Sequence, residues 1–222
     1  ILGSDGVGIF EGKEVIINPS INWGDNPLFP GKDYKILGLP ANGTFSEYVK
    51  VGEKQLYPKP VHLSWEESAA LPLAGLTAFR ALFTKAKLQK GENVLLSGIG
   101  GGVALFAFQF AIATGANVYV TSGSEEKIEA AVKLGAKGGV NYKNEDWAKE
   151  LKSISGGFDV IIDSAGGEGF SKLAKCCKPG GRICIYGGTT GSIKLSPQLI
   201  FWKQISVMGT SMGNDQEFED ML

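Results

Sequence analysis

The sequence predicts an α/β protein in which a doubly wound parallel sheet follows a smaller β-rich domain. From about residue 93 to residue 208, short apolar runs alternate regularly with helical segments, a pattern typical of a parallel sheet covered on both faces. A glycine-rich turn joins the first apolar run to the first helix. The first 90 residues instead hold short β-prone runs between loops rich in Gly, Pro and Asn.

The alternating part predicts six strands and five crossover helices, which is the size of one complete doubly wound domain. The strands are expected near residues 93–97, 117–121, 139–142, 158–163, 182–186 and 205–208. The helices are expected near residues 102–114, 125–134, 145–152, 169–176 and 197–202. Ser124, which precedes two glutamates, can cap the second of these helices, and Gly135 can close it.

The N-terminal part predicts a different organisation. Residues 14–17 and 44–51 are the clearest β-prone runs, and they do not belong to the parallel sheet. Ser64 and Glu67 have the spacing of a capping box, which predicts a helix reaching about residue 70, and a second helix is expected over residues 75–85. We therefore expect a β-rich domain over residues 1–70 and an α/β domain over residues 71–222.

The glycine-rich turn has the chemistry of a phosphate-binding loop. Glycine permits a tight turn and a close approach of backbone N–H groups to a pyrophosphate, and the N-terminus of the following helix attracts negative charge. The strict Gly-x-Gly-x-x-Gly pattern would need glycine in place of Val103, so only the looser Gly98-x-x-Gly101-x-x-Ala104 is matched. The alternative is an ordinary strand-to-helix turn of an α/β protein.

Composition excludes several classes of function. The net charge of −1, with 43% hydrophobic residues, indicates neither a nucleic-acid-binding patch nor an acidic tail. The longest apolar run, residues 103–113, is too short to span a bilayer, so no membrane partner is expected. Cys176, Cys177 and Cys184 form no disulfide framework and suit a reducing, cytoplasmic location. The chain begins with Ile1, so a targeting segment ahead of it stays open.

Seven segments resemble, in order, a medium-chain dehydrogenase/reductase of the branch that includes quinone oxidoreductases and zinc-type alcohol dehydrogenase-like proteins. They are residues 3–8, 43–49, 71–78, the glycine turn, 135–142, 158–166 and 180–187. The resemblance implies a GroES-like β-barrel domain followed by a Rossmann domain. Relatives are longer, which implies that the chain is a fragment with a partial barrel, a shortened passage between Gly8 and Glu14, and no final helices.

The zinc-binding relatives supply a contrast. They carry His where this chain has Ser4 and Cys where it has Leu73, and the loop that holds their four cysteines corresponds to residues 18–40, which contain none. The only histidine, His62, is expected in a surface loop. We therefore predict no bound zinc, and we expect Asp5, at the position of an acid that supports the zinc site in relatives, to make local hydrogen bonds.

The cofactor is predicted from the end of the second Rossmann strand. NAD-selective folds place Asp or Glu there, whereas residues 121–124 read Thr-Ser-Gly-Ser. Ser122 and Ser124 can donate hydrogen bonds to a 2′-phosphate, Lys127 can supply a cation, and Tyr142 resembles the tyrosine that helps hold this phosphate in quinone oxidoreductases. We expect NADPH rather than NADH, although Lys127 can equally be a solvated helix residue and the nearby Glu125 is unfavourable if it points inward.

The resemblance implies further cofactor contacts along the chain. They are Thr77, Gly98, Gly101, Gly102, Val103, Ser164, Ala165, Tyr186, Gly187 and Met208. Thr77 is expected near the nicotinamide, and its alternative is a hydroxyl bonded to the helix backbone. No catalytic residue or proton donor is identified.

Without zinc, alcohol oxidation lacks its usual means of lowering the hydroxyl pKa, so reduction is favoured. The resemblance implies NADPH-dependent reduction of a small molecule, a quinone or an α,β-unsaturated carbonyl, by a homodimer. The alternatives are a dinucleotide-binding fragment with impaired catalysis and an NAD(P)-dependent alcohol dehydrogenase. A short-chain dehydrogenase is disfavoured because no tyrosine is followed by lysine four residues later, and a methyltransferase is disfavoured by Ser122.

Overall fold

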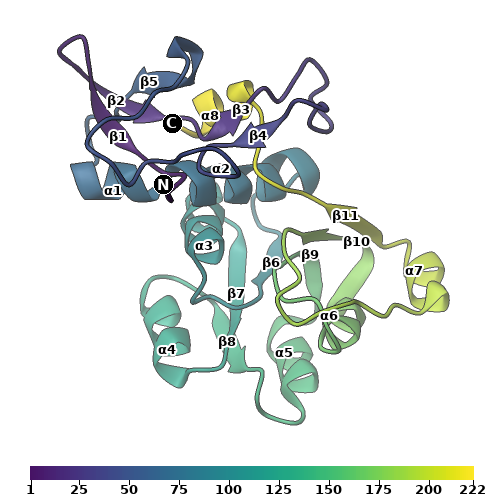
Figure 1. Ribbon diagram of the computed structural model, residues 1–222. Coiled ribbons are helices and arrows are strands. Elements are labelled where there is room, and N and C mark those ends of the chain that lie inside the picture. The colour runs from purple at the N-terminus through teal and green to yellow at the C-terminus, as the bar shows by residue number, and fades with distance from the viewer. The chain divides into compact units, whose positions relative to one another are not determined.

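The computed structural model describes all 222 residues, which divide into two compact units (Figure 1). The small unit comprises Ile1–Thr77 together with Met212–Leu222, and the Rossmann unit comprises Ala78–Ser211. None of the helices combines the length and apolar character that crossing a membrane requires.

The Rossmann unit is built on a six-stranded parallel sheet, which confirms the predicted doubly wound α/β fold. The strands are β6 (Asn93–Leu96), β7 (Asn117–Ser122), β8 (Gly138–Asn141), β9 (Phe158–Asp163), β10 (Cys177–Ile185) and β11 (Ser206–Gly209). Their order across the sheet is β11-β10-β9-β6-β7-β8, so the chain first builds outward from β6 in one direction and then returns to build outward in the other. The strand order therefore reverses between β6 and β9.

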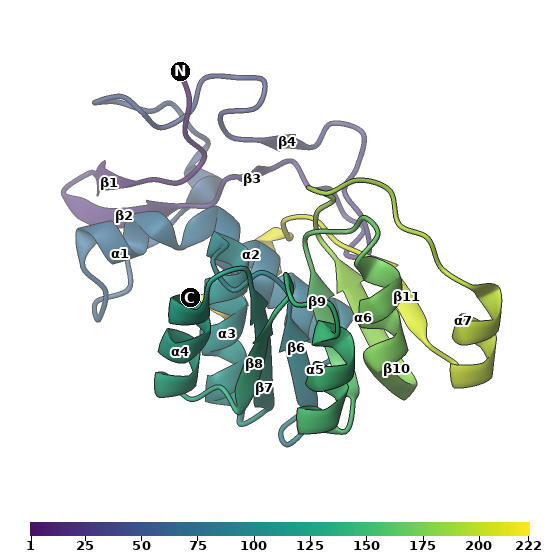
Figure 2. The same cartoon turned by 90° about the horizontal axis from the view of Figure 1, so that it is seen from below.

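Helices connect the strands and cover both faces of this sheet (Figure 2). They are α3 (Gly102–Thr114), α4 (Glu125–Lys133), α5 (Trp147–Ser155), α6 (Phe170–Cys176) and α7 (Pro197–Lys203), and a π-helical segment, Arg80–Lys85, precedes β6. Because side chains alternate along a strand, Val94 and Leu96 pack in one core with α3 and α4, whereas Leu95 packs in a second core with α5 and α6. The near-continuous apolar strands of the sequence reflect this burial on both sides.

The small unit contains antiparallel strands that resemble a partial GroES-like domain. Strands β1 (Val7–Phe10), β2 (Lys13–Ile17) and β5 (Leu56–Pro58) form one sheet, and β3 (Ser20–Ile21) pairs with β4 (Lys35–Ile36). Between β1 and β2, Glu11 and Gly12 both have positive φ, as a two-residue hairpin turn requires. The short passage after Gly8 thus closes as a regular hairpin.

The helices of the small unit come from both ends of the chain. They are α1 (Trp65–Ala70), α2 (Pro72–Phe79, whose last residues enter the Rossmann unit) and α8 (Asp215–Met221), with a 3₁₀ turn at Glu53–Gln55. The predicted capping box is confirmed, since Ser64 and Glu67 exchange backbone and side-chain hydrogen bonds. Helix α8 is joined to the unit by a 2.9 Å hydrogen bond from Asn18 Nδ2 to Asp215 Oδ1.

The expected strand at residues 44–51 is wrong. The N–H groups of Thr44 and Phe45 donate to Gly3 and Leu2, which lie in an irregular segment, and the Thr44 hydroxyl donates to the carbonyl of Asp5 at 2.6 Å. A β-prone sequence becomes a strand only where another strand is available to pair with it, and residues 44–51 meet no such partner.

Candidate cofactor-binding site

A cavity of about 590 Å³ lies within the Rossmann unit at the carboxyl ends of β6 and β9, where the strand order reverses. This is the place where open α/β sheets bind their ligands. Its lining includes Ser97, Gly98, Thr121, Tyr142, Trp147, Asp163, Ser164, Ala165, Gly166, Thr189 and Thr190.

The glycine turn forms the start of this site. Gly98 has a φ of +69°, which favours glycine, and its N–H donates to Thr121 Oγ1 at 3.2 Å. The N–H of Gly101 donates to the carbonyl of Gly98, and α3 then begins at Gly102 with no side-chain cap. The first N–H groups of α3, including those of Gly102 and Val103, therefore have no helical acceptor and suit an anion.

Asp163 connects two loops of the site. Its buried carboxylate accepts a short hydrogen bond from the Ser97 hydroxyl, at the end of β6, and a 2.9 Å bond from the N–H of Gly166, after β9. Both loops are thereby held beside one cavity. The sequence-based list of site residues omitted Asp163, although an acid at the end of an apolar strand was visible at that position.

The loops after β9 and β10 also meet. A methyl group on Gly187 would lie 2.8 Å from the carbonyl oxygen of Ser164, so only glycine allows this approach. Ala165 accepts hydrogen bonds from both the N–H and the hydroxyl of Thr190, each at 2.9 Å. Burial raises the pKa of Tyr186, which keeps its phenol protonated. The structure thus brings four predicted residues together, and it adds Thr190, which sequence reasoning missed.

A second cavity of about 400 Å³, here named the β7 pocket, lies at the end of β7. It is lined by Gly98, Gly100, Gly101, Ser122, Gly123, Ser124, Lys127, Tyr142 and Lys143. A methyl group on Gly100 would lie 2.8 Å from Lys127 Nζ, and one on Gly123 would lie 2.7 Å from the Tyr142 hydroxyl. The two glycines therefore allow the lysine and tyrosine tips to lie close over the backbone.

The structure corrects the role of Ser124 in its helix. Ser124 is the N-cap residue of α4, but its side chain makes no capping hydrogen bond, and its own N–H donates to Ser122 Oγ at 3.2 Å. Its hydroxyl is therefore not used by the helix and belongs to the lining of the β7 pocket. The sequence also missed Lys143, which follows Tyr142 directly.

Six predicted contacts do not line either cavity: Thr77, Gly102, Val103, Tyr186, Gly187 and Met208. The Thr77 hydroxyl belongs to the small unit and donates to the carbonyl of Leu73 at 2.8 Å, which is the helix-bonded alternative, so its contact with a nicotinamide stays a prediction. Met208 lies in β11 and packs against the core formed with α3 and α4. Its predicted contact with the carboxamide is likewise untested.

The residues present do not form a zinc site. No group of three or more His, Cys, Asp or Glu side chains is placed to hold a metal ion. The three cysteines are buried in the Rossmann cores, and burial raises the pKa of Cys177 to about 11 and that of Cys184 to about 12, which disfavours the thiolate that zinc needs. Asp5 accepts the N–H of Leu73, 68 residues away in the sequence, at 2.6 Å.

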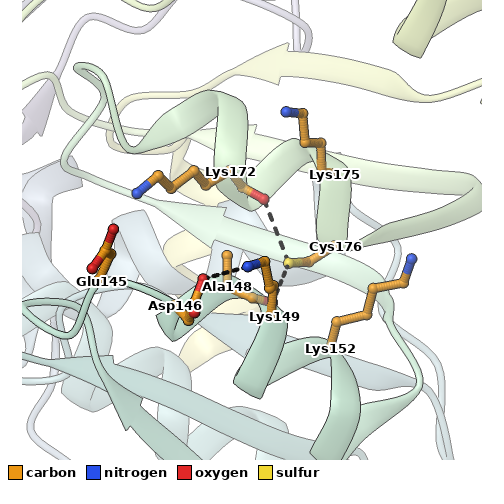
Figure 3. Close-up of a pocket in the computed structure, with 8 residues that line it drawn as sticks. All are labelled: Glu145, Asp146, Ala148, Lys149, Lys152, Lys172, Lys175 and Cys176. Atoms are coloured by element: carbon orange, nitrogen blue, oxygen red, sulfur yellow. Dashed lines mark hydrogen bonds and ion pairs between the residues drawn. The ribbon is translucent and has the colours of Figure 1, made fainter.

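A further basic cavity, the α5–α6 hollow, lies between two helices of the Rossmann unit (Figure 3). Its lining comprises Glu145, Asp146, Ala148, Lys149, Lys152, Lys172, Lys175 and Cys176. Lys149 pairs with Asp146 at 2.6 Å, and Figure 3 shows the side chains of Lys152, Lys172 and Lys175 spreading in different directions. The lysines of this hollow do not converge on one point.

The chain is similar to known proteins over most of its length. A family model described as zinc-binding dehydrogenase matches residues 102–222. The chain is 40% identical to the zinc-type alcohol dehydrogenase-like protein YogA of Leptosphaeria maculans, over 95% of the chain and 63% of that protein. It is 34% identical to the quinone oxidoreductase of Rattus norvegicus, over 81% of the chain and 55% of that protein.

Solved structures agree on the fold. A crystal structure of an NAD-dependent alcohol dehydrogenase matches with a TM-score of 0.92 and 36% identity, over 100% of this chain and 70% of that one. The 2-octenoyl-CoA carboxylase reductase CinF, in complex with NADP and 2-octenoyl-CoA, matches with a TM-score of 0.89 and 27% identity, over 100% of this chain and 58% of that one. The chain thus spans from about half to about two thirds of the length of the proteins it matches.

Proposed function

The chain belongs to the zinc-binding dehydrogenase family of medium-chain dehydrogenases/reductases, and on this premise we propose that it reduces a quinone or an α,β-unsaturated carbonyl with NADPH, without zinc. The β7 pocket carries the proposal, because its lining holds two lysines, two serines and a tyrosine but no carboxylate. A carboxylate at the end of β7 would bind the ribose hydroxyls of NADH and repel a 2′-phosphate.

The residues of the Rossmann unit have separate roles in this proposal. Lys127 supplies the cation for the 2′-phosphate, while Ser122, Ser124 and Tyr142 donate hydrogen bonds to its oxygens. The uncapped N-terminus of α3, behind Gly101, holds the pyrophosphate. The loops after β9 and β10 hold the remaining half of the cofactor. When bound, NADPH supplies the hydride, and the protein contributes orientation and the exclusion of water.

The kind of substrate is proposed from the donor set and from the relatives. Because the residues present do not form a zinc site, the chain offers no Lewis acid to lower the pKa of an alcohol, which favours reduction. One relative is named a quinone oxidoreductase, and another was solved with 2-octenoyl-CoA, which is an α,β-unsaturated thioester. A homodimer is part of the same proposal.

An NAD-dependent alcohol dehydrogenase is the second candidate. The 36% identity to a protein of that description favours it. The carboxylate of Glu125 also favours it, because Glu125 directly follows Ser124, a lining residue of the β7 pocket, in the sequence. The third candidate binds the dinucleotide but has lost turnover. Cofactor choice and turnover separate the three.

The test has three measurements on the 222-residue chain. Fluorescence titration should show tighter binding of NADPH than of NADH. NADPH should then be consumed with a panel of quinones and enones, and elemental analysis should find well under one zinc per chain. Preference for NADH, or near-stoichiometric zinc, would contradict the proposal. Binding of NADPH without turnover on any member of the panel would favour the third candidate.

A further inference from the structure

Asn141 makes two hydrogen bonds at the edge of the β7 pocket. It ends β8 and lies opposite Ser122 in the parallel pairing of β7 with β8. Its Nδ2 donates to Glu125 Oε1 at 2.8 Å, and its Oδ1 accepts the backbone N–H of Lys143 at 3.1 Å. A carboxylate can only accept and a backbone N–H can only donate, so a single orientation of the amide satisfies both partners.

The first hydrogen bond restrains a carboxylate that follows the pocket residues directly in the chain. Glu125 is the first residue of α4 and directly follows Ser124, which lines the pocket. A carboxylate turned toward the pocket would repel a phosphate. With its Oε1 bonded to Asn141, Glu125 is directed toward the end of β8 and is absent from the pocket lining.

The second hydrogen bond fixes the backbone of Lys143, whose side chain is the second cation of the pocket lining. The Lys143 stem lies over Gly123, where a methyl group would come within 3.0 Å of Lys143 Cε. Lys127 Nζ lies over Gly100 in the same way, at 2.8 Å from the equivalent position. Lysines from α4 and from the turn after β8 therefore both line the β7 pocket, where together they can neutralise a doubly charged phosphate.

We propose that Asn141 is a positioning residue that sets cofactor choice: it holds Glu125 aside and Lys143 in place, so that the β7 pocket accepts a 2′-phosphate. The inference rests on the proposed function, since it concerns the same phosphate. Asn141 acts through its two neighbours and does not itself bind the phosphate.

The test uses 2′,5′-ADP, which carries the 2′-phosphate, and 5′-AMP, which does not. Both are titrated by calorimetry into the parent chain and its variants. Asn141→Ala should weaken the binding of 2′,5′-ADP about 3- to 10-fold and leave that of 5′-AMP within about twofold, because the released Glu125 carboxylate can turn toward the pocket and repel the 2′-phosphate. Lys143→Gln should weaken 2′,5′-ADP about tenfold. Asn141→Leu, close in size to asparagine, repeats the first measurement if the alanine variant fails to fold.

A double-mutant cycle isolates the role of Glu125. If Asn141 acts in part by restraining that carboxylate, then Glu125→Gln should change little by itself but should restore part of the affinity that Asn141→Ala loses, the remainder being lost through Lys143. Asn144→Ala and Lys172→Gln are the matched controls, because they remove an exposed amide and an exposed lysine outside the pocket.

Each other outcome decides against the inference. It is overturned if Asn141→Ala weakens both nucleotides equally, if the double variant is no better than the single one, or if Lys143→Gln leaves 2′,5′-ADP unchanged. In those cases a parent chain that still prefers 2′,5′-ADP leaves the proposed function standing. A parent chain without that preference overturns the proposed function, and this inference with it.

Discussion

The β7 pocket and the α5–α6 hollow are both lined by lysines, but the backbone and the other side chains around those lysines differ. In the β7 pocket, glycines bring the backbone within reach of Lys127 and Tyr142, the end of β7 and the start of α4 hold the serines, and no carboxylate lines the cavity. In the α5–α6 hollow, four lysines stand on two helices and two carboxylates share the space, one of them paired with Lys149. Positive charge alone does not make a phosphate site, because such a site also needs converging donors and a close backbone.

Replacing a lysine with glutamate should give the largest difference in cofactor affinity between the two cavities. Lys127→Glu should weaken NADPH about 100-fold or more, because it removes one charge-assisted hydrogen bond and adds repulsion, while NADH should change less than about threefold. Lys172→Glu, the control in the α5–α6 hollow, should leave both affinities within about twofold. Fluorescence titration measures all four constants. An equal loss of affinity for NADPH and NADH in Lys127→Glu would show that Lys127 does not recognise the 2′-phosphate.

Removing a carboxylate should destabilise the fold much more at Asp163 than at Asp146. Asp163→Ala leaves two buried donors, Ser97 Oγ and the N–H of Gly166, without their acceptor and should lower the free energy of unfolding by about 2–4 kcal/mol. Asp146→Ala, in the α5–α6 hollow, removes only an exposed ion pair with Lys149 and should cost less than about 0.5 kcal/mol. Urea unfolding measures both. Similar losses would mean that Asp163 does not anchor the two loops.

The partly buried ion pair between Glu92 and Arg182 should make the stability of the fold depend on pH. Burial alone would raise the pKa of Glu92, but hydrogen bonds from Arg182, at 2.7 and 2.9 Å, outweigh it and hold the pKa below its usual 4.5. Because the pKa is lower in the folded protein than in the unfolded chain, the ionised carboxylate stabilises the fold above pH 4.5. This contribution is lost as the pH falls below that value. Glu92→Gln should therefore cost about 1–2 kcal/mol at pH 7 and less at pH 3.5.

The control is Asp146→Asn, which removes only an exposed ion pair with Lys149 and should cost less than about 0.5 kcal/mol at pH 7. Urea unfolding at pH 7 and at pH 3.5 checks both variants. If Glu92→Gln lost as much stability at pH 3.5 as at pH 7, the loss would not come from the ion pair of the Glu92 carboxylate.

The smallest expected effect concerns the glycine frame. A methyl group on Gly123 would meet the Tyr142 hydroxyl at 2.7 Å and Lys143 Cε at 3.0 Å, and both are movable side-chain ends. Gly123→Ala should thus leave the fold intact but weaken NADPH about 3- to 10-fold, since displaced donors lose one hydrogen bond. Gly8→Ala, at a position with open space around it, is the control. An unchanged NADPH affinity in Gly123→Ala would show that this close approach does not matter.

Much of the candidate site could be predicted, because it depends on local backbone chemistry. Glycines after an apolar strand predicted the turn at Gly98, and the lack of an acid after β7 drew attention to Ser122 and Lys127. Asp163 and Thr190 were missed because their importance comes from hydrogen bonds to loops that are distant in sequence. The run at residues 44–51 was wrong because its composition favours a strand but says nothing about a partner.

The sequence by itself determined the parallel six-stranded sheet, since alternating strands and helices that bury both sheet faces leave few other arrangements. It also determined the place of the glycine turn, which is proposed to bind phosphate. Only the tertiary structure decided how Asn141, sixteen residues after Glu125, could hold that carboxylate and Lys143 together. The physical reason is register: hydrogen bonds between side chains depend on which strand ends lie side by side, and that pairing arises only when the whole sheet has formed.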